Sequence, residues 1–403
     1  MTSIDTTSKQ DAKSLKLSEA VELSVVIPCL NEEATLPICI KKCLTSFKRL
    51  GVSGEVVVCD NGSTDRSVEI ATRLGVTVVH ESRKGYGSAL LSGMKTAQGR
   101  WLLMGDADNT YDFSDIGPFM EKLREGYDIV IGNRLTDRLE KGAMPWKNRY
   151  IGTPLLTTLL HLFYHIQIRD SQCGMRGLTR EAFQKMSLKC SGMEFASEML
   201  VKAALFQLKV VNVPISYSVA PNRTPHLRPF RDGWRHFKFL LMFSPTHLFF
   251  IPGALFLGGG LFLLTMLLRY PVFRLFGFPM DTHWTIVGSA SVILGSQILS
   301  IFFFAKVLAL TRGYLPYDKI TQGLYRTFRF EHGLLLGLAI FLTGWATELY
   351  ILCEWILSRF GPLYEFRLGI FGMTFIIVGL QTIFSSFFLS ILGSESQERE
   401  TRR

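Results

Sequence analysis

Two carboxylates one residue apart, Asp106 and Asp108, directly follow the apolar run 101–104. An apolar run that ends in this way is typical of a buried strand, and open α/β sheets bind ligands at the carboxyl ends of their strands. Hard oxygen ligands at this spacing suit Mg²⁺ or Mn²⁺, which proteins usually share with substrate phosphates. A lone Asp-x-Asp is more often an acidic surface turn, so the setting of this pair decides its meaning.

The composition points to an anionic partner and to a membrane. The chain has 403 residues, a formal net charge of +10 and 48% hydrophobic residues, which favours nucleic acid or a membrane surface as partner. Charged, mixed sequence extends to about Phe243, and long apolar blocks follow it. The seven cysteines include no Cys-x-x-Cys pair, so neither a zinc site nor a disulfide framework is expected.

Short apolar runs alternate with helix-period segments from Glu22 onward, which is typical of βαβ units around a mostly parallel sheet. The pattern predicts strands at 23–27, 55–59, 76–79, 101–104 and 128–132, with helices at 34–50, at 88–97 and one ending at residue 74. Acids follow three of these strands: Glu32, Asp60 and the Asp106/Asp108 pair. Because the carboxyl ends of parallel strands meet at one edge of a sheet, these acids are expected to form one site.

Other nucleotide-binding and nucleophile motifs do not fit the chain. Gly85-Tyr86-Gly87 lacks the third glycine of a dinucleotide fingerprint, and it follows the third predicted strand. No Gly-x-x-x-x-Gly-Lys-Ser/Thr loop and no Gly-x-Ser-x-Gly elbow occur. We therefore exclude Rossmann cofactor binding and P-loop chemistry.

The ordered motifs resemble the family-2 glycosyltransferases of the GT-A fold, and among them the polyprenyl-phosphate glycosyltransferases of the dolichyl-phosphate-mannose synthase type. The resemblance covers about residues 22–243. It rests on Val26 to Pro28 with Asn31 and Glu32, Asp60 to Asp65, Lys84 to Gly87 with Ala89, Asp106 to Asp108, Gly132 to Arg134, Arg149 with Thr153, and Asp170 to Gly174. It implies an α/β, Rossmann-like catalytic domain with a mostly parallel sheet.

By this resemblance the donor is a nucleotide-sugar. Its site would be lined by Pro28, Asn31, Glu32, Asp60, Lys84, Gly85 and Asp106. Asp108 would hold Mg²⁺ or Mn²⁺, with Asp106 nearby, and the metal would neutralise the departing diphosphate. The family often has Gln two residues beyond the pair, where this chain has Thr110, so the third protein ligand is Thr110 or a water takes its place.

The resemblance also implies a lipid phosphate as acceptor, bound by Arg134, Arg149 and Thr153. A phosphate monoester has a second pKa of about 6 and is anionic at pH 7, so it needs no general base. Arginine matches phosphate with a planar fork and keeps its charge. Direct attack of this phosphate on the anomeric carbon would invert its configuration in one step. The predicted catalytic residues are therefore Asp106, Asp108, Arg134 and Arg149.

Three further side chains are less informative. Asp65 is expected to serve in a turn or cap, and Cys173 to be a small buried residue. Glu198 would contact the donor sugar or simply favour the dipole of its helix, and the sequence leaves both roles open.

Four apolar blocks follow the soluble half, at 248–268, 286–310, 334–357 and 368–392, each long enough to cross a bilayer core of about 30 Å. Before them, residues 229–243 interleave basic and aromatic side chains, as expected of an amphipathic helix at an anionic lipid surface. The predicted organisation is a disordered arm (1–20), the GT-A domain (21–224), an interfacial amphipathic segment (225–244) with a hinge at 225–228, an all-α transmembrane domain of four helices (245–393) and a polar cytosolic tail (394–403).

Charge asymmetry predicts that the catalytic domain and both termini are cytosolic, at an inner or ER-like membrane. The basic flanks at 312–329 and 399–403 outweigh those of the opposite loops, and residues 1–20 lack the apolar region of a signal peptide. Glu348 and Glu354 lie in the third apolar block, where interhelical pairing and the far interface are the simpler explanations. The domain is expected to anchor and orient the catalytic domain, and self-association through it is left open.

The predicted reaction is transfer of a hexose from a UDP-glucose-like donor, with GDP-mannose as the other donor considered, to undecaprenyl or dolichyl phosphate. Residues 109–113 depart from the mannose-synthase pattern and favour the UDP-sugar. A processive polysaccharide synthase is the first alternative, but its family carries a Gln-x-x-Arg-Trp motif that this chain lacks. A non-catalytic nucleotide-sugar binder is the second, and the intact acid pair opposes it because two close like charges are costly. No nucleic-acid partner is expected.

Overall fold

The computed structural model describes residues 21–219, 229–270, 272–311 and 330–400. The chain forms two compact units, which divide between Leu240 and Leu241. Four predictions concern regions wholly or partly outside the described residues: the disordered arm at 1–20, the hinge at 225–228, the basic flank at 312–329 and, at residues 401–403, the basic flank at 399–403.

The first unit is built on a seven-stranded sheet with strand order β3-β2-β1-β4-β6-β5-β7. Its strands are β1 (Leu23–Cys29), β2 (Gly54–Asp60), β3 (Thr77–His80), β4 (Trp101–Met104), β5 (Ile129–Asn133), β6 (Arg176–Thr179) and β7 (Val210–Pro214). Neighbouring strands are parallel except at β6, which runs antiparallel to β4 and β5. The predicted α/β class with a mostly parallel sheet is confirmed, whereas β6 and β7 are additional to the predicted strands.

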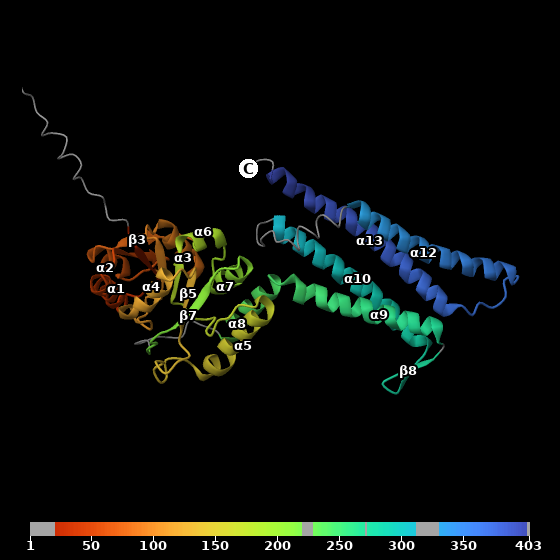
Figure 1. Ribbon diagram of the computed structural model, residues 1–403, viewed down its shortest axis with the longest axis horizontal. Helices are drawn as coiled ribbons and strands as arrows, with labels where there is room; N and C mark the ends of the chain where they lie inside the picture. Colours follow the sequence, from red (N-terminus) through yellow and green to blue (C-terminus); the bar gives the residue numbers. More distant parts are fainter. Residues whose placement is uncertain (1–20, 220–228, 271, 312–329, 401–403) are drawn as a thin grey trace, which may run out of the picture. The chain divides into compact units, whose positions relative to one another are not determined.

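Helices cover this sheet, as Figure 1 shows. They are α1 (Leu36–Leu50), α2 (Ser67–Arg73), α3 (Tyr86–Thr96), α4 (Gly117–Arg124), α5 (Thr153–Tyr164), α6 (Arg180–Met186) and α7 (Phe195–Leu205), with a short 3₁₀ turn η2 (Phe113–Asp115) and a π-helical turn η3 (Asn148–Gly152). All residues of β4 and β5 are buried, as are most of β1 and β2. Continuous apolar runs of this kind are expected for strands that are covered on both faces.

Helix α8 (Pro229–Met242) matches the predicted amphipathic segment. Phe239 and Leu240 are buried, whereas Trp234 and Lys238 are exposed. Two polar contacts attach the helix to the first unit: the Tyr164 hydroxyl donates to the Leu240 carbonyl at 2.7 Å, and His236 Nδ1 lies 2.8 Å from Ser197 Oγ. One side of this helix is therefore packed against the first unit, while Trp234 and Lys238 remain exposed.

The second unit contains helices α9 (Ile251–Arg269), α10 (Thr282–Thr311), α12 (Phe330–Leu357) and α13 (Phe366–Glu400), a π-helical turn η4 (Thr246–Phe250) and a hairpin of β8 (Phe273–Leu275) and β9 (Phe278–Met280). By length and composition these four long helices could each cross a membrane. The prediction of four apolar helices is confirmed. Helix α13 continues to Glu400, through residues where a polar tail was expected.

Candidate active site

The loops that follow β1 and β2 are joined by side-chain hydrogen bonds. Asn31, which has a positive φ of 58°, accepts a hydrogen bond from the Thr64 amide at 2.8 Å. Its own amide donates to Ser63 Oγ at 3.1 Å, and the amide of Glu32 donates to Ser67 Oγ at 2.9 Å. Asparagine tolerates this left-handed conformation better than most residues. The predicted donor residues Asn31 and Glu32 therefore lie beside the turn after β2.

Asp60 is the last residue of β2 and is buried. Its carboxylate accepts from the amides of Gly62 and Ser63 at 3.2 and 2.9 Å, and His80 Nδ1 lies 3.3 Å away. Burial raises the pKa of this carboxyl, but the hydrogen bonds outweigh burial and hold the pKa below its ordinary value. Asp60 is therefore ionised at neutral pH, on the strand next to Pro28 of β1.

Asn61 connects this turn to the predicted donor residues Lys84 and Gly85. The Gly85 amide donates to Asn61 Oδ1 at 2.7 Å, and Lys84 Nζ donates to the Asn61 carbonyl at 2.9 Å. Gly85 has a φ of 139°, and a Cβ atom there would overlap the Ser191 carbonyl. Only glycine fits this position, because both the dihedral and the close approach exclude a side chain.

The acid pair follows β4, and a hydroxyl orients each carboxylate. Tyr86 Oη donates to Asp106 Oδ1 at 3.0 Å, and Thr110 Oγ1 donates to Asp108 Oδ1 at 2.6 Å. Burial raises the pKa of Tyr86, and the neighbouring Asp106 charge raises it further, so this hydroxyl remains a donor. Thr110, predicted as a metal ligand, is here a hydrogen-bond donor to Asp108. Tyr86 lies inside the Lys84–Gly87 motif, yet the sequence did not indicate its contact with Asp106.

The donor set of Asp106 and Asp108 fits a hard divalent cation, since both contribute carboxylate oxygens. No group of three or more His, Cys, Asp and Glu side chains that could hold a metal occurs in the part of the chain that the structure describes. Mg²⁺ commonly takes one or two protein carboxylates and completes its shell with water and substrate phosphates. The pair therefore suits a metal that arrives with, or is completed by, a diphosphate.

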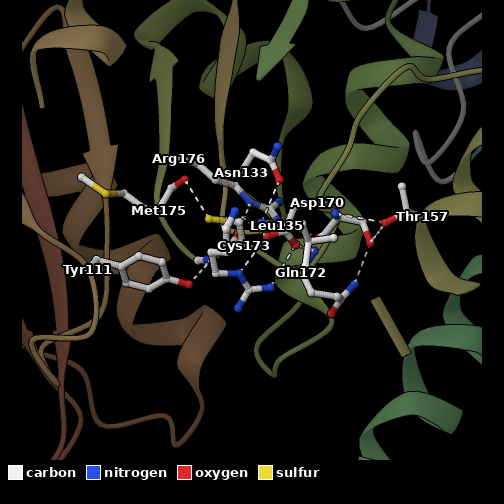
Figure 2. A network of polar contacts seen from close by, with 12 residues as sticks. Tyr111, Asn133, Leu135, Thr157, Asp170, Gln172, Cys173, Met175 and Arg176 are labelled. Atoms are coloured by element: carbon white, nitrogen blue, oxygen red, sulfur yellow. Dashed lines mark hydrogen bonds and ion pairs between the residues drawn. The ribbon is translucent and has the colours of Figure 1, made fainter. Parts of the chain in front are cut away.

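The segment from Asp170 to Gly174 approaches the acid pair from the other side. The Gly174 amide donates to Tyr111 Oη at 2.7 Å, and a Cβ atom at Gly174 would lie 3.0 Å from Asp106 Oδ2. Thr157 of α5 donates to Ser171 Oγ at 3.0 Å. Figure 2 shows this segment between Tyr111 on one side and Thr157 on the other. One loop thus joins Asp106 to helix α5.

Arg134 and Asp170 form a buried, bidentate ion pair. Arg134 Nε and Nη2 donate to the two carboxylate oxygens at 2.8 and 2.9 Å, and the Arg134 amide donates at 3.1 Å. The guanidinium also lies 5.3 Å from the centroid of the Tyr217 ring. The prediction assigned Arg134 to the acceptor phosphate, but in this structure its fork holds Asp170 and, through it, the loop beside the acid pair.

Arg149 and Thr153 lie where η3 leads into α5. Thr153 is buried, whereas Arg149 is half-buried with its guanidinium 5.3 Å from the Tyr150 ring. In the described part of the chain, no ion pair or hydrogen bond is found that joins Arg149 to the acid pair or to Arg134. The outer surface of this region exposes large apolar side chains: Trp146, Tyr150, Ile151, Leu155 and Leu162. The Arg149 guanidinium therefore lies beside an exposed apolar surface. The sequence analysis did not identify this surface.

Comparison with known proteins assigns the chain to a family. A family model described as Glycosyl transferase family 2 matches residues 24–187, and one described as Glycosyltransferase family 2 C-terminal transmembrane region matches residues 303–393. The low-salt glycan biosynthesis hexosyltransferase Agl6 of Haloferax volcanii is 34% identical over 377 residues, which cover 93% of this chain and 90% of that protein. This chain belongs to glycosyltransferase family 2.

Two further similarities cover the catalytic half. The dolichyl-phosphate hexose transferase of Haloferax volcanii is 29% identical over 212 residues, covering 53% of this chain and 89% of that protein. The crystal structure of glucosyl-3-phosphoglycerate synthase from Mycobacterium tuberculosis is 22% identical, with a TM-score of 0.44, covering 55% of this chain and 80% of that chain. The sequence resemblance to family 2 is confirmed, and this family-2 glycosyltransferase is an integral membrane protein.

Arg176 is the centre of the loop structure behind the site of this glycosyltransferase. It is fully buried and donates only to backbone carbonyls, those of Ser171, Cys173 and Ala196, at 2.9, 2.8 and 2.6 Å. Burial lowers its pKa. The residue therefore ties the 170–174 loop (Figure 2) to the start of α7. Among the residues that the structure describes, Arg176 forms no ion pair with an acid, and nothing in its local sequence indicates its burial, so sequence reasoning did not find it.

The structure also bears on three side chains for which the sequence was less informative, and only the role of Glu198 had been left open. Glu198 is buried, accepts from the amides of Lys189 and Cys190, and forms an ion pair with Lys202 at 2.8 Å. These contacts favour a structural role for Glu198 over contact with a sugar. Asp65 accepts from the Ser67 amide at 2.9 Å, as predicted for a turn residue. Burial raises the pKa of Cys173 to about 12, so its thiol is inert as expected.

Proposed function

We propose that this glycosyltransferase transfers a hexose from a nucleotide-sugar to a polyprenyl phosphate at the cytosolic membrane face. The reaction is metal-dependent and inverting, and it yields a polyprenyl-phosphate-sugar. A UDP-glucose-like donor is favoured by residues 109–113, and GDP-mannose is the alternative donor. The acceptor is undecaprenyl or dolichyl phosphate.

The observation that carries this proposal is the position of Arg149 beside the apolar surface of η3 and α5. An arginine bordered by exposed Tyr150, Ile151 and Leu155 suits a ligand with an anionic head and a hydrocarbon tail. The Thr157–Ser171 hydrogen bond links this helix to the loop that touches Asp106. The name of the Haloferax dolichyl-phosphate hexose transferase supports the same class of acceptor.

The charges suit the two substrates. On the donor side, Asp60, the turn at Asn61 and Gly85, and Asp106 would receive the nucleotide-sugar. Asp106 and Asp108 would hold Mg²⁺ or Mn²⁺, which when bound offsets the negative charge that develops on the leaving diphosphate. On the acceptor side, Arg149 with Thr153 would bind and orient the lipid phosphate, while the Arg134–Asp170 pair fixes the loop between the two substrates.

A phosphate acceptor simplifies the chemistry. Its second pKa is about 6, so an oxygen of the phosphate is already anionic at neutral pH and no side chain has to remove a proton. That oxygen forms a bond to the anomeric carbon, while the bond from this carbon to the diphosphate oxygen breaks with its electron pair. The nucleoside diphosphate leaves, and the configuration at the anomeric carbon inverts.

The test uses the purified full chain in detergent with Mn²⁺, undecaprenyl phosphate and a panel of labelled UDP- and GDP-sugars. We expect one labelled, organic-extractable lipid that fails to form without metal or without the lipid phosphate. Nucleotide release without glycolipid would reject the acceptor, and a growing water-soluble polymer would instead support a processive polysaccharide synthase. Asp108→Asn protein is the control for contaminating activity.

A further inference from the structure

The membrane unit contains an internal repeat that the sequence analysis did not detect. Four glycines of the α9–α10 hairpin recur 84 residues later in the α12–α13 hairpin: Gly253 and Gly337, Gly260 and Gly344, Gly288 and Gly372, and Gly295 and Gly379. The contacts recur with them. A Cβ atom at Gly260 would overlap the Gly288 carbonyl, and a Cβ atom at Gly344 would overlap the Gly372 carbonyl. Small residues thus let the backbones approach closely within each hairpin.

The two hairpins are joined by contacts of another kind. Helices α10 and α13 meet through side-chain hydroxyls and an amide: Ser289 with Thr374 at 2.6 Å, Ser296 with Gln381 at 3.2 Å, and Ser385 with Ser300 at 3.3 Å. Hydrogen bonds of this kind between membrane helices are individually weak. Within each hairpin the backbones are therefore in close contact at the glycines, whereas α10 and α13 meet through side chains.

A cavity of about 390 Å³ is lined by all four helices. Its walls include Leu261, Val292, Phe303, Ile340, Phe375 and Leu389. The lining hydroxyls of Ser300, Thr382 and Ser386 each donate to the carbonyl four residues earlier in their own helix, at 3.0, 2.8 and 2.8 Å. Because these hydroxyl protons are already donated within the helices, they are not available to hydrogen-bond an anion or a sugar. The lining of the cavity therefore suits a hydrocarbon chain.

One part of the cavity lies toward the helix ends that the charge pattern predicts to be cytosolic. Val292 and Phe375 lie in the amino-terminal halves of α10 and α13, whereas Gly333 lies near the start of α12 and Phe303 and Leu389 lie toward the carboxyl ends of α10 and α13. These helix ends are the cytosolic ones in the topology predicted from charge. The volume is within the roughly 300–1,000 Å³ of ligand pockets, which is enough for a segment of a long chain rather than the whole of it.

We infer that this cavity binds part of the branched hydrocarbon chain of the polyprenyl phosphate acceptor. The inference rests on the proposed function, since that function supplies a lipid with a chain much longer than its head. The cavity would hold the chain, and the phosphate would remain outside the cavity. Selection for long isoprenoid chains would then be a property of the membrane unit.

The kinetic test fills the cavity and varies the length of the acceptor chain. Ile340→Trp adds bulk at a lining position, and Leu342→Trp is the matched control at an exposed position on the same helix. We expect Ile340→Trp to raise KM for undecaprenyl phosphate about tenfold, with no change for a two-isoprene phosphate and no effect of Leu342→Trp. Equal losses with both acceptors, or no loss with either, would overturn the cavity site and leave the proposed function intact.

A second measurement does not depend on turnover. Undecaprenyl phosphate with a photoreactive diazirine near the middle of its chain is cross-linked to the wild-type full chain, and the labelled peptides are mapped by mass spectrometry. We expect labels on lining residues of α10, α12 and α13, with competition by unlabelled undecaprenyl phosphate and not by straight-chain phosphatidic acid. Equal competition by phosphatidic acid would mean that the cavity holds bulk lipid, and labels confined to exposed faces would exclude the site. Labelling without glycolipid formation would reject the proposed function alone.

Discussion

On the proposed donor side of the site, Asp60 and Asp108 accept hydrogen bonds mainly from groups two or three residues away, although His80 also contacts Asp60, whereas on the proposed acceptor side Arg134 and Asp170 hold each other across 36 residues. The donor carboxylates accept hydrogen bonds from amides and hydroxyls. The acceptor pair is a buried bidentate ion pair. Neutral hydrogen-bond donors orient a carboxylate and leave its charge available to a ligand. A buried ion pair instead neutralises the charge of each partner.

This difference predicts that substitutions in the two regions affect different properties, turnover in one and folding stability in the other. Removing a donor-side carboxylate leaves neutral partners that water can satisfy, so the fold should tolerate the change. Removing one member of a buried ion pair leaves an uncompensated charge in a medium that solvates it poorly. Substitutions on the donor side should therefore affect turnover, and those at the Arg134–Asp170 pair should first affect folding.

The largest effect is expected for Asp108→Asn. The substitution keeps the shape and removes the charge that a divalent cation needs, so kcat should fall about 10³-fold. The thermal unfolding temperature should stay within a degree or two of the wild type, as is common for changes that bury no new charge. Turnover of labelled donor and unfolding in detergent measure the two quantities. Asp115→Asn, at a half-buried acid in η2, is the control, and retained turnover in Asp108→Asn would remove the pair from the mechanism.

Asp170→Ala tests the acceptor side. Loss of one partner from the buried pair should destabilise the catalytic unit by about 3–5 kcal/mol. Arg134→Met should cost a similar amount, and the double variant should lose less than the two single losses combined. Unfolding of all four proteins in one detergent gives this cycle. Strictly additive losses would mean that the two side chains do not stabilise each other.

Arg149→Ala should weaken binding of the acceptor lipid without weakening binding of the donor nucleotide. Without this cation, KM for the lipid phosphate should rise about tenfold, the factor that 1.4 kcal/mol of lost binding produces. Affinity for the nucleotide, measured by equilibrium binding, should not change. Arg138→Ala is the matched control because Arg138 is exposed and pairs with Asp115 at 3.2 Å. An equal weakening of nucleotide and lipid would move Arg149 out of the acceptor site.

Tyr86→Phe should have a smaller effect on the donor side. It removes the hydroxyl that donates to Asp106 at 3.0 Å, a bond worth about 1 kcal/mol, so kcat/KM should fall about fivefold. The concentration of Mn²⁺ needed for half-maximal activity should rise with it. A wild-type metal requirement in Tyr86→Phe would show that this hydroxyl does not orient the acid pair.

The smallest effect concerns Asp60 and pH. Its folded pKa lies below the unfolded value, so it stabilises the fold above the unfolded pKa, and this contribution is lost as pH falls through the folded pKa. Asp60→Asn protein should therefore lose less stability on acidification than the wild type. Unfolding temperatures measured from pH 7 downward provide the comparison, and parallel curves would contradict the assignment.

Local sequence pattern was sufficient for the donor side of the fold. The first five strands begin and end within two residues of their predicted bounds. An apolar run bounded by turn residues predicts a strand from the local sequence alone. The acids after β1, β2 and β4 share an edge because those strands are parallel neighbours. The amphipathic α8 and the four long apolar helices likewise follow from periodicity and length, which a single sequence contains.

Tertiary structure alone decided the acceptor side. The antiparallel β6 lies between β4 and β5, and the segment before it reaches both Arg134 and the acid pair. No local pattern predicts that Arg134 binds Asp170, that Arg176 donates to three backbone carbonyls, or that the i,i+4 pair of Glu198 and Lys202 is fully buried. The free energy of a charged side chain depends on partners and burial that distant segments supply, so the sequence determines which charges are present and the fold determines which of them remain available to substrates.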